Sequence, residues 1–463
     1  MGQTRYFVYF TPLENSDSNL YGDEIDVSDR IRLSGIGNIR RSIDSSDYDI
    51  GVFVFSDLEL TGYNFNGYFN DETDTRSIFS TTRDRCKVRI VIQDVTLVKN
   101  SSGTVLSETI NDTNTYRGLI NEEATRLDIT SDSIRFKVLS RDSVLRTTKI
   151  SGGVVTDGMT FGAAIEAILN VPRITSVLNF NAADINPSLD LEIDDGGFFD
   201  NKSVKEGLDK LLLASNSVLL INDDGDMVVR SRIPDETRPI VNLYGKNDIH
   251  KRENIIDITS YNTGRQRMFT SIIVNNTQVS NDTYVQAFGL RQKTIRLDFI
   301  TSNISEELIA DQLVDEFKTP KIELGVKVST HLAKTIQLLD RVSVNYPLRV
   351  KPIEDKFLPV VGITEIGDPW MPLPYQFGSI EIPSRLAFKV LEIDDNPDKF
   401  TSILKLRQTG KNLDDGVFDV PGSCIVGFAI IGEGLICVGG DPCDAFAGVA
   451  AVGAAQVGCS VIN

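Results

Sequence analysis

Histidine is nearly absent from this sequence of 463 residues, in which only His250 and His331 occur, in different segments. This scarcity excludes most histidine-based metal sites and most Ser-His or Cys-His nucleophiles. The sequence also lacks a glycine-rich phosphate loop with its lysine, and it lacks a Gly-x-Ser-x-Gly nucleophile elbow. Together these absences predict a protein that is not an enzyme.

Positive charge is also in short supply. The chain has 47 Lys and Arg against 65 Asp and Glu, which gives a formal net charge of −18. An acidic protein repels nucleic-acid phosphates, so the composition argues against sequence-specific binding of DNA or RNA. No run of roughly 18 apolar, charge-free residues occurs either, so no membrane-spanning helix is expected.

Residues 1–150 have the pattern of a mainly β domain. Apolar and polar residues alternate at 87–92, and 52–55 is a short apolar run typical of a strand. Between such runs lie turn-rich stretches such as 70–74. Many short strands joined by polar turns predict a sandwich or barrel.

Residues 151–240 change character and predict a small α/β insert. Thr160 is a candidate N-cap for one helix, and Ser203 with Glu206 forms a capping-box pair for a second. Asp224-Gly225 between two apolar runs predicts a β-hairpin. The acidic residues around Asp224 suggest a calcium loop as an alternative, but the ligand order of an EF-hand is not met, which favours a simple turn.

Residues 241–412 return to β structure, interrupted by one helix. Ser305 is its expected N-cap, and Pro320 is expected to stop it. The side chains expected to face the core are Leu308, Ile309, Leu313 and Phe317. Apolar residues then alternate with polar ones over 322–328, which predicts a strand.

Residues 413–463 form a separate apolar segment, rich in Gly and Ala and without Lys or Arg from Pro421 onward. It contains four of the five cysteines, with 12, 5 and 15 residues between them, and no CxxC pair. Three interpretations stay open: small apolar core residues, disulfides, or one metal centre held by four thiolates. The fifth cysteine, Cys86, is expected in a strand core. The four are Cys424, Cys437, Cys443 and Cys459.

The predicted fold is mainly β (α+β), with two β-barrel domains flanking a small α/β insert and a short Gly/Ala/Cys-rich C-terminal segment. The order of four motifs, at 25–44, 202–230, 339–347 and 388–407, resembles the tail hub proteins of long-tailed bacteriophages, related to the baseplate hub of contractile phages. The resemblance covers about residues 1–412. In that family two barrels per chain form a pseudo-six-fold ring in a trimer.

The resemblance implies a structural, virion-associated protein made in the host bacterial cytoplasm. As a homotrimer it is expected to close the tail tube at the tip and to adapt a six-fold tube to a three-fold tip. Its expected partners are a distal tail or tube protein, the tape measure protein and a tail tip or central fibre protein. Because the net charge is −18, we expect an acidic channel without an array of Lys and Arg, which DNA passes without specific binding.

The resemblance also bears on the cysteines. Some lambda-like tail hubs end in a cysteine-bearing domain that holds an iron–sulfur cluster, so a 4Fe-4S cluster on the four C-terminal cysteines is implied. An alternative for the apolar stretch 425–451 is contact with the host membrane or with the next tip protein. Two other functions remain as alternatives: a receptor- or carbohydrate-binding adhesin, and a tail-associated lytic enzyme, for which the roughly fifty residues after the second barrel are short.

Overall fold

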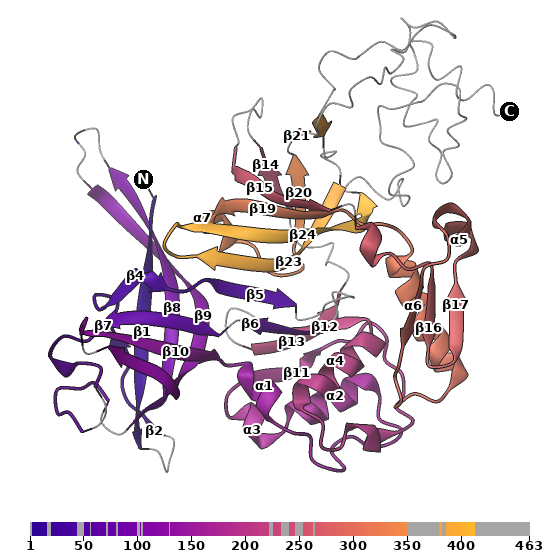
Figure 1. The fold of residues 1–463 in the computed structure, drawn as a ribbon, viewed down its shortest axis with the longest axis horizontal. Helices are drawn as coiled ribbons and strands as arrows, with labels where there is room; N and C mark the ends of the chain where they lie inside the picture. The colour runs from indigo at the N-terminus through magenta and orange to yellow at the C-terminus, as the bar shows by residue number, and fades with distance from the viewer. Residues whose placement is uncertain are drawn as a thin grey trace, which may run out of the picture.

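A computed structural model gives the fold of most of the chain (Figure 1). In the described part, no helix is long and apolar enough to cross a membrane. The described residues are 2–15, 20–43, 51–55, 57–70, 73–79, 82–99, 102, 105–128, 130–221, 226–232, 240–245, 253–262, 264–345, 347–349, 379–381 and 386–412.

The first sheet is antiparallel and curled around its own apolar core. Its strand order is β2-β1-β8-β9-β10-β7-β4, and β3 also pairs with β1. Every second side chain of its strands points to the concave side and fills it with apolar groups. Phe10, Phe69 and Phe136 lie in this core, and their ring centroids are 5.2–5.8 Å apart. The strands are β1 (Gly2–Asn15), β2 (Leu20–Tyr21), β3 (Ile25–Asp26), β4 (Ile31–Ile36), β7 (Leu58–Tyr63), β8 (Thr82–Lys99), β9 (Val105–Asp128) and β10 (Ser133–Ser140).

The second sheet has eleven strands and joins segments far apart in the chain. Its main order is β11-β13-β12-β6-β5-β23-β24-β19-β15, with β14 and β20 attached to β23. It contains β5 (Ile39–Ile43), β6 (Gly51–Phe55), β11 (Asn179–Ile185), β12 (Ser217–Ile221), β13 (Asp226–Ser231), β14 (Val241–Tyr244), β15 (Ile255–Asn262), β19 (Glu323–Ser329), β20 (Arg341–Asn345), β23 (Leu386–Asn396) and β24 (Thr401–Asn412).

Two strands from the predicted first domain lie in this second sheet. β5 pairs with β23, and β6 pairs with β12, so the segment that was assigned to residues 1–150 bridges the insert and the C-terminal strands. The pairing is reinforced by ion pairs from Arg40 to Glu392 at 2.8 Å and from Arg41 to Asp395 at 3.4 Å. Figure 1 shows β5 and β6 between β23 and β12 within this sheet.

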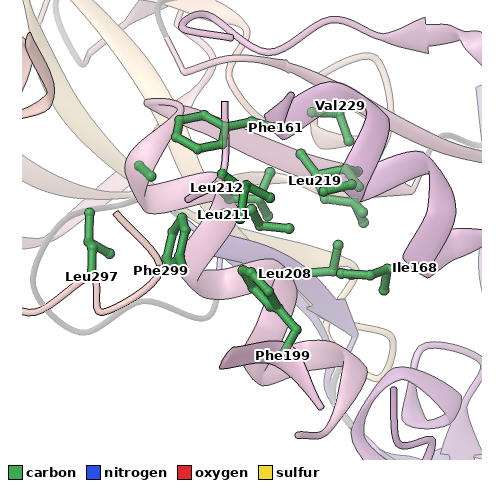
Figure 2. Packing of buried hydrophobic residues seen from close by; sticks show 14 of the residues in the cluster. Phe161, Ile168, Phe199, Leu208, Leu211, Leu212, Leu219, Val229, Leu297 and Phe299 are labelled. Atoms are coloured by element: carbon green, nitrogen blue, oxygen red, sulfur yellow. The ribbon is translucent and has the colours of Figure 1, made fainter. Parts of the chain in front are cut away.

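The α/β insert packs its helices against β12 and β13, as the capping pattern predicts. Thr160 caps α2, and Ser203 caps α4 by accepting a hydrogen bond from the Glu206 amide at 3.2 Å. Figure 2 shows the apolar faces of both helices meeting Leu219 and Phe299 in one core. The helices are α1 (Ser143–Thr147), α2 (Phe161–Leu169), α3 (Pro172–Thr175) and α4 (Val204–Ala214).

A smaller unit carries α5 and α6, whereas α7 contacts β19, β23 and β24 of the second sheet. The three-stranded sheet of β17, β16 and β18 packs on α6, and β21 pairs with β22. The elements are β16 (Ser271–Val274), β17 (Thr277–Ser280), β18 (Gln292–Ile295), β21 (Pro347–Arg349), β22 (Ser379–Glu381), α5 (Asp282–Phe288), α6 (Asn303–Phe317) and α7 (Thr330–Ala333); 3-10 turns lie at Phe65–Gly67, Gly196–Phe199 and Arg265–Arg267.

Helix α6 corrects two details of the sequence prediction. Its N-cap is Ser302 rather than Ser305. The carboxylate of Asp194 accepts hydrogen bonds from the backbone amides of Thr301 and Ser302, and the helix therefore begins one turn earlier. Leu308 does not face the core: it is 44% exposed, whereas Ile309 on the opposite face is buried. The mainly β class, with two curled half-barrel sheets and few helices, is confirmed.

Candidate interaction surface

The predicted metal ligands Cys424, Cys437, Cys443 and Cys459 lie outside the described residues, as does the turn at Asp224. Cys86 lies in β8 and is buried, as predicted, and burial raises the pKa of its thiol. Within the described ranges, no group of three or more His, Cys, Asp or Glu side chains is placed to hold a metal ion. Among the described residues, charged and aromatic side chains are instead concentrated on one surface of the first sheet.

Successive side chains in the strands of the first sheet point alternately to its two faces. One face is the apolar core already described, and the other is exposed or half-exposed. In β8, for example, Val88 and Ile90 point into the core while Lys87 and Arg89 point outward. The same alternation in β1, β9 and β10 builds one continuous outer face.

This outer face carries more cations than carboxylates in a protein whose net charge is −18. The described positions of β1, β8, β9 and β10 that are not buried hold nine cations and five carboxylates. We call this surface the basic face. Its cations are Arg5, Arg83, Arg85, Lys87, Arg89, Arg117, Arg126, Arg135 and Lys137, and its carboxylates are Glu14, Asp84, Glu122, Glu123 and Asp128.

The register of the strands places like charges directly opposite one another. Arg89 of β8 pairs with Arg117 of β9, and Arg126 of β9 pairs with Arg135 of β10. Directly opposed side chains in an antiparallel pair have Cβ atoms about 4.5–5.5 Å apart, and like charges at that separation destabilise the sheet.

Crowding of cations is also visible at the edge of the basic face. Burial, and then the nearby Arg141 guanidinium, lower the pKa of Lys87 below its usual value. Burial, and then Arg117, likewise lower the pKa of Arg141. In both cases burial is the larger cause, and the neighbouring cation adds to it.

Aromatic rings lie between the cations. The Arg89 guanidinium lies 4.4 Å from the centroid of the Tyr9 ring, and the Lys87 ammonium lies 3.6 Å from that of Tyr21. Phe7 stacks beside Tyr9 with 6.4 Å between the ring centroids. Such cation–π contacts hold long basic side chains in fixed positions and reduce the entropy that they lose when they bind an anion.

Carboxylates of neighbouring strands balance only part of this charge. Glu24 forms an ion pair with Arg89, and Glu59 of β7 lies opposite Lys137. With these two, seven described carboxylates lie on or beside the basic face against nine cations.

The insert carries the opposite pattern. Residues 174–201 contain no Lys or Arg, and five of their six acidic side chains are exposed. We call this segment the acidic loop. Its carboxylates are those of Asp184, Asp190, Glu192, Asp194, Asp195 and Asp200, of which Asp184 is half-buried.

A second charged cluster is buried and has a structural role. Glu316 of α6 accepts hydrogen bonds from Arg232 and from Lys321, both at 2.7 Å, and Lys389 of β23 lies 3.6 Å away. Burial alone raises the pKa of Glu316, but the three cations outweigh it and hold that pKa well below its usual range. The cluster ties α6 to the second sheet through charges that are shielded from water.

Comparison with known proteins identifies a solved structure that shares this fold. No protein-family model and no curated protein matches this sequence. The solved tail protein from Neisseria meningitidis MC58 superposes with a TM-score of 0.50 at 12% identity, over 90% of this chain and 98% of that one. The 43 kDa tail protein of prophage MuSo2 from Shewanella oneidensis gives a TM-score of 0.46 at 11% identity, over 87% and 97% of the chains.

At this level of identity the likeness shows a shared fold. The prophage tail protein gp18 from Listeria monocytogenes EGD-e gives a TM-score of 0.44 at 12% identity, over 87% and 94% of the chains. These structural neighbours are all tail proteins, two of them from prophages. The fold is thus shared with the Neisseria meningitidis tail protein over 90% of this chain and 98% of that one.

The sequence prediction missed the basic face. The prediction from the net charge, an acidic channel face without an array of Lys and Arg, stays a prediction, because the channel belongs to the proposed assembly. Net charge sums over the whole chain and conceals segregation between faces. The available signal was the alternation over 85–90, where every second residue is a cation.

Proposed function

We propose that this chain is a structural protein of a bacteriophage tail. The observation that carries the proposal is the fold shared with the Neisseria meningitidis tail protein, which spans 90% of this chain and 98% of the other. The sequence motifs that resemble tail hubs lead to the same proposal independently.

Within the tail, the proposed position is the tip. There the chain acts as a hub, a homotrimer whose curled sheets form a ring with a channel for DNA ejection. A closed ring satisfies symmetric contacts on every copy, and the sheets that meet in it leave fewer open edges. The proposed neighbours are the distal tail or tube protein, the tape measure protein and a tail tip or central fibre protein.

Immunogold labelling of phage particles that carry this chain tests the location. We expect antibodies against the purified chain to label the tail tip, with labelling lost in particles from which the gene is deleted. Deletion is also expected to stop tail assembly, because a tube without its hub has no starting surface. Labelling of the capsid, or particles that assemble normally without the chain, would contradict the proposal.

The C-terminal cysteines are proposed to hold one 4Fe-4S cluster, through Cys424, Cys437, Cys443 and Cys459. Four thiolates are the number that such a cluster takes, and the segment is poor in large side chains, so a cluster could act as its core. Anaerobic purification followed by iron and sulfide analysis is expected to give four of each per chain. A Cys437→Ser variant with unchanged iron content would contradict the proposal, and Cys86→Ser is the matched control.

A carbohydrate-binding function is the second candidate, favoured by one feature of the first sheet. A polar depression of about 590 Å³ opens beside the loop that follows β7. Hydroxyl, amide and carboxylate groups of this kind suit the hydroxyls of a sugar. A glycan array is expected to show binding that a Thr125→Val variant loses, whereas absence of binding on the array would rule this candidate out. The lining residues are Asn70, Thr73, Asp74, Thr75, Arg83, Thr125 and Leu127.

A further inference from the structure

We propose that the polar depression beside the loop after β7 binds a neutral pyranose, an uncharged six-membered sugar ring, and discriminates against acidic sugars. This inference rests on carbohydrate binding, the second candidate function, and it adds the class of sugar and the groups that bind it. Three observations carry it: the way the walls of the depression are built, the hydrogen-bonding capacity left in them, and the balance of their charges.

One wall of the depression is an irregular stretch of β9. The register of β9 on β10 shifts between Arg135 and Lys137, so that four residues of β9, 122–125, lie opposite a single residue of β10. Such a bulge bends its strand and redirects its side chains. The hydroxyl of Thr125 donates a hydrogen bond to the Asn121 carbonyl at 2.9 Å and closes the bulge, while Thr125 lines the depression.

The opposite wall is the loop that follows β7, and its own side chains hold it in place. The Asn64 amide donates a hydrogen bond to the Asn70 side chain, and the Asn70 amide donates one to Asp74, both at 2.7 Å. Arg76 adds an ion pair to Asp74. The turn at Gly67 is tight, because a Cβ there would overlap the Asp74 carboxylate. The wall is thus formed before a ligand arrives, which lowers the entropic cost of binding.

Polar groups in both walls keep hydrogen-bonding capacity for a ligand. Arg83 has five N–H donors, of which three bind oxygens of the protein and two stay available. Asn70 uses only one of its two amide hydrogens. The hydroxyl of Thr75 is exposed and makes no hydrogen bond within the part of the chain that the structure describes. The walls therefore offer donors and acceptors together, and a sugar hydroxyl, which donates and accepts, matches both.

The charges of the walls are already paired within the protein. Arg83 forms an ion pair with Glu122, and Arg76 forms one with Asp74. The Asp74 carboxylate accepts four hydrogen bonds, and those from Arg76, followed by that from Asn70, hold the pKa of Asp74 well below its usual range. An acidic sugar would bring a charge for which the described lining has no unpaired cation, and an uncharged sugar avoids this cost.

An apolar side chain completes the depression. Leu127 lies directly opposite Ile134 of β10, a core residue, so both side chains lie on the same face of the sheet. Leu127 is nevertheless 44% exposed, and it extends the apolar core to the surface at this end of the sheet. The C–H groups of a pyranose ring can pack on this side chain while the hydroxyls reach the polar walls. The volume of about 590 Å³ lies in the range of small-ligand sites.

NMR titration of the full chain with simple sugars tests the proposal. The neutral probes are the methyl pyranosides of glucose, galactose, mannose and N-acetylglucosamine, and the acidic probe is glucuronic acid. We expect at least one neutral probe to bind with a dissociation constant on the order of 1 mM, since a single ring has few atoms. Its affinity should be the same at about 0.05 M and 0.5 M salt, because a neutral ligand forms no ion pair for salt to screen. Glucuronic acid should bind at least ~10-fold more weakly.

Two variants assign the binding to this depression. Thr75→Val removes a hydroxyl that has no hydrogen-bond partner in the described structure, and Leu127→Ser removes the apolar contact. Each should weaken binding of the neutral sugar by about 10-fold and leave the unfolding temperature unchanged, because both side chains are exposed. The matched control is Thr294→Val, which alters an exposed threonine of β18 and should bind as the wild type does.

Two outcomes would overturn the inference and leave carbohydrate binding standing. Binding of acidic glycans alone, with an affinity that falls as salt rises, would show that the site selects a charge. Neutral sugars bound equally well by Thr75→Val, Leu127→Ser and the wild type would place the sugar site elsewhere. Absence of all binding on the glycan array would remove carbohydrate binding and this inference together, whereas the tail location would still be decided by immunogold labelling.

Discussion

At the scale of single residues, the buried carboxylate of Glu316 decides how α6 is held. It is shared by Arg232, Lys321 and Lys389, which come from three other parts of the chain. The aromatic ring of Phe317 lies next to the same cluster, 4.8 Å from the Arg232 guanidinium. Removing the one anion leaves three cations whose side chains are at most 5% exposed without their shared partner.

Glu316→Gln is therefore expected to lower the free energy of unfolding by about 3–5 kcal/mol, the usual cost of breaking a buried ion pair by removing one partner. Urea denaturation followed by circular dichroism measures the change. Glu307→Gln, on the exposed face of the same helix, is the control and should change stability by less than ~0.5 kcal/mol. Equal effects of the two variants would refute the role given to Glu316.

Titration of Lys389 makes the free energy of unfolding depend on pH. Burial, and then Arg232, lower the pKa of Lys389 to about 7 in the folded protein, against an ordinary value of 10.5. Below pH 7 the side chain is charged in both states, so the full cost of burying the charge is present. Between about pH 7 and 10.5 the folded state sheds the proton first, so stability rises with pH by up to ~1.4 kcal/mol per unit.

In Lys389→Met this rise should be missing, because the variant has no proton to release at that position. The comparison of wild type with variant, by denaturation at several pH values from about 6 to 10, isolates the contribution of this group. A constant difference between the two proteins over that range would contradict the assignment.

At the scale of elements, hydrogen bonds between residues close together in the sequence could be predicted, whereas those between residues far apart in the sequence could not. Ser203 and Thr160 cap their helices as their local patterns indicate. Helix α6 instead starts at a carboxylate 107 positions away, that of Asp194, whose bonds to the Thr301 and Ser302 amides lower its pKa. No local pattern indicates that partner, and for this reason the prediction of Ser305 as the N-cap is wrong.

The two caps give a direct comparison. Ser203→Ala removes an acceptor for the Glu206 amide and should lower the free energy of unfolding by about 1 kcal/mol. Ser302→Ala should cost less than ~0.5 kcal/mol, since its side chain makes no cap hydrogen bond in the described structure. Urea titration of both variants decides the matter; a larger loss in Ser302→Ala would contradict this account of how α6 begins.

At the scale of the whole molecule, the mainly β class and the α/β insert followed from periodicity, but the arrangement of the sheets did not. Strand β5 was assigned to the first domain by its place in the chain, yet it pairs with β23 more than 340 residues later. Pairing between distant strands leaves no mark in the local pattern of either strand. The basic face was missed for a similar reason, because its cations come from four strands that only the fold brings together.

The central claim is that copies of this chain form the hub at the tip of a phage tail. The most direct test is a cryo-electron microscopy reconstruction of the tail tip from particles that carry the chain. We expect three copies in one ring, with the first and second curled sheets alternating around a channel. A tail tip that contains no copy of the chain, or copies that do not surround the path of the DNA, would contradict the account.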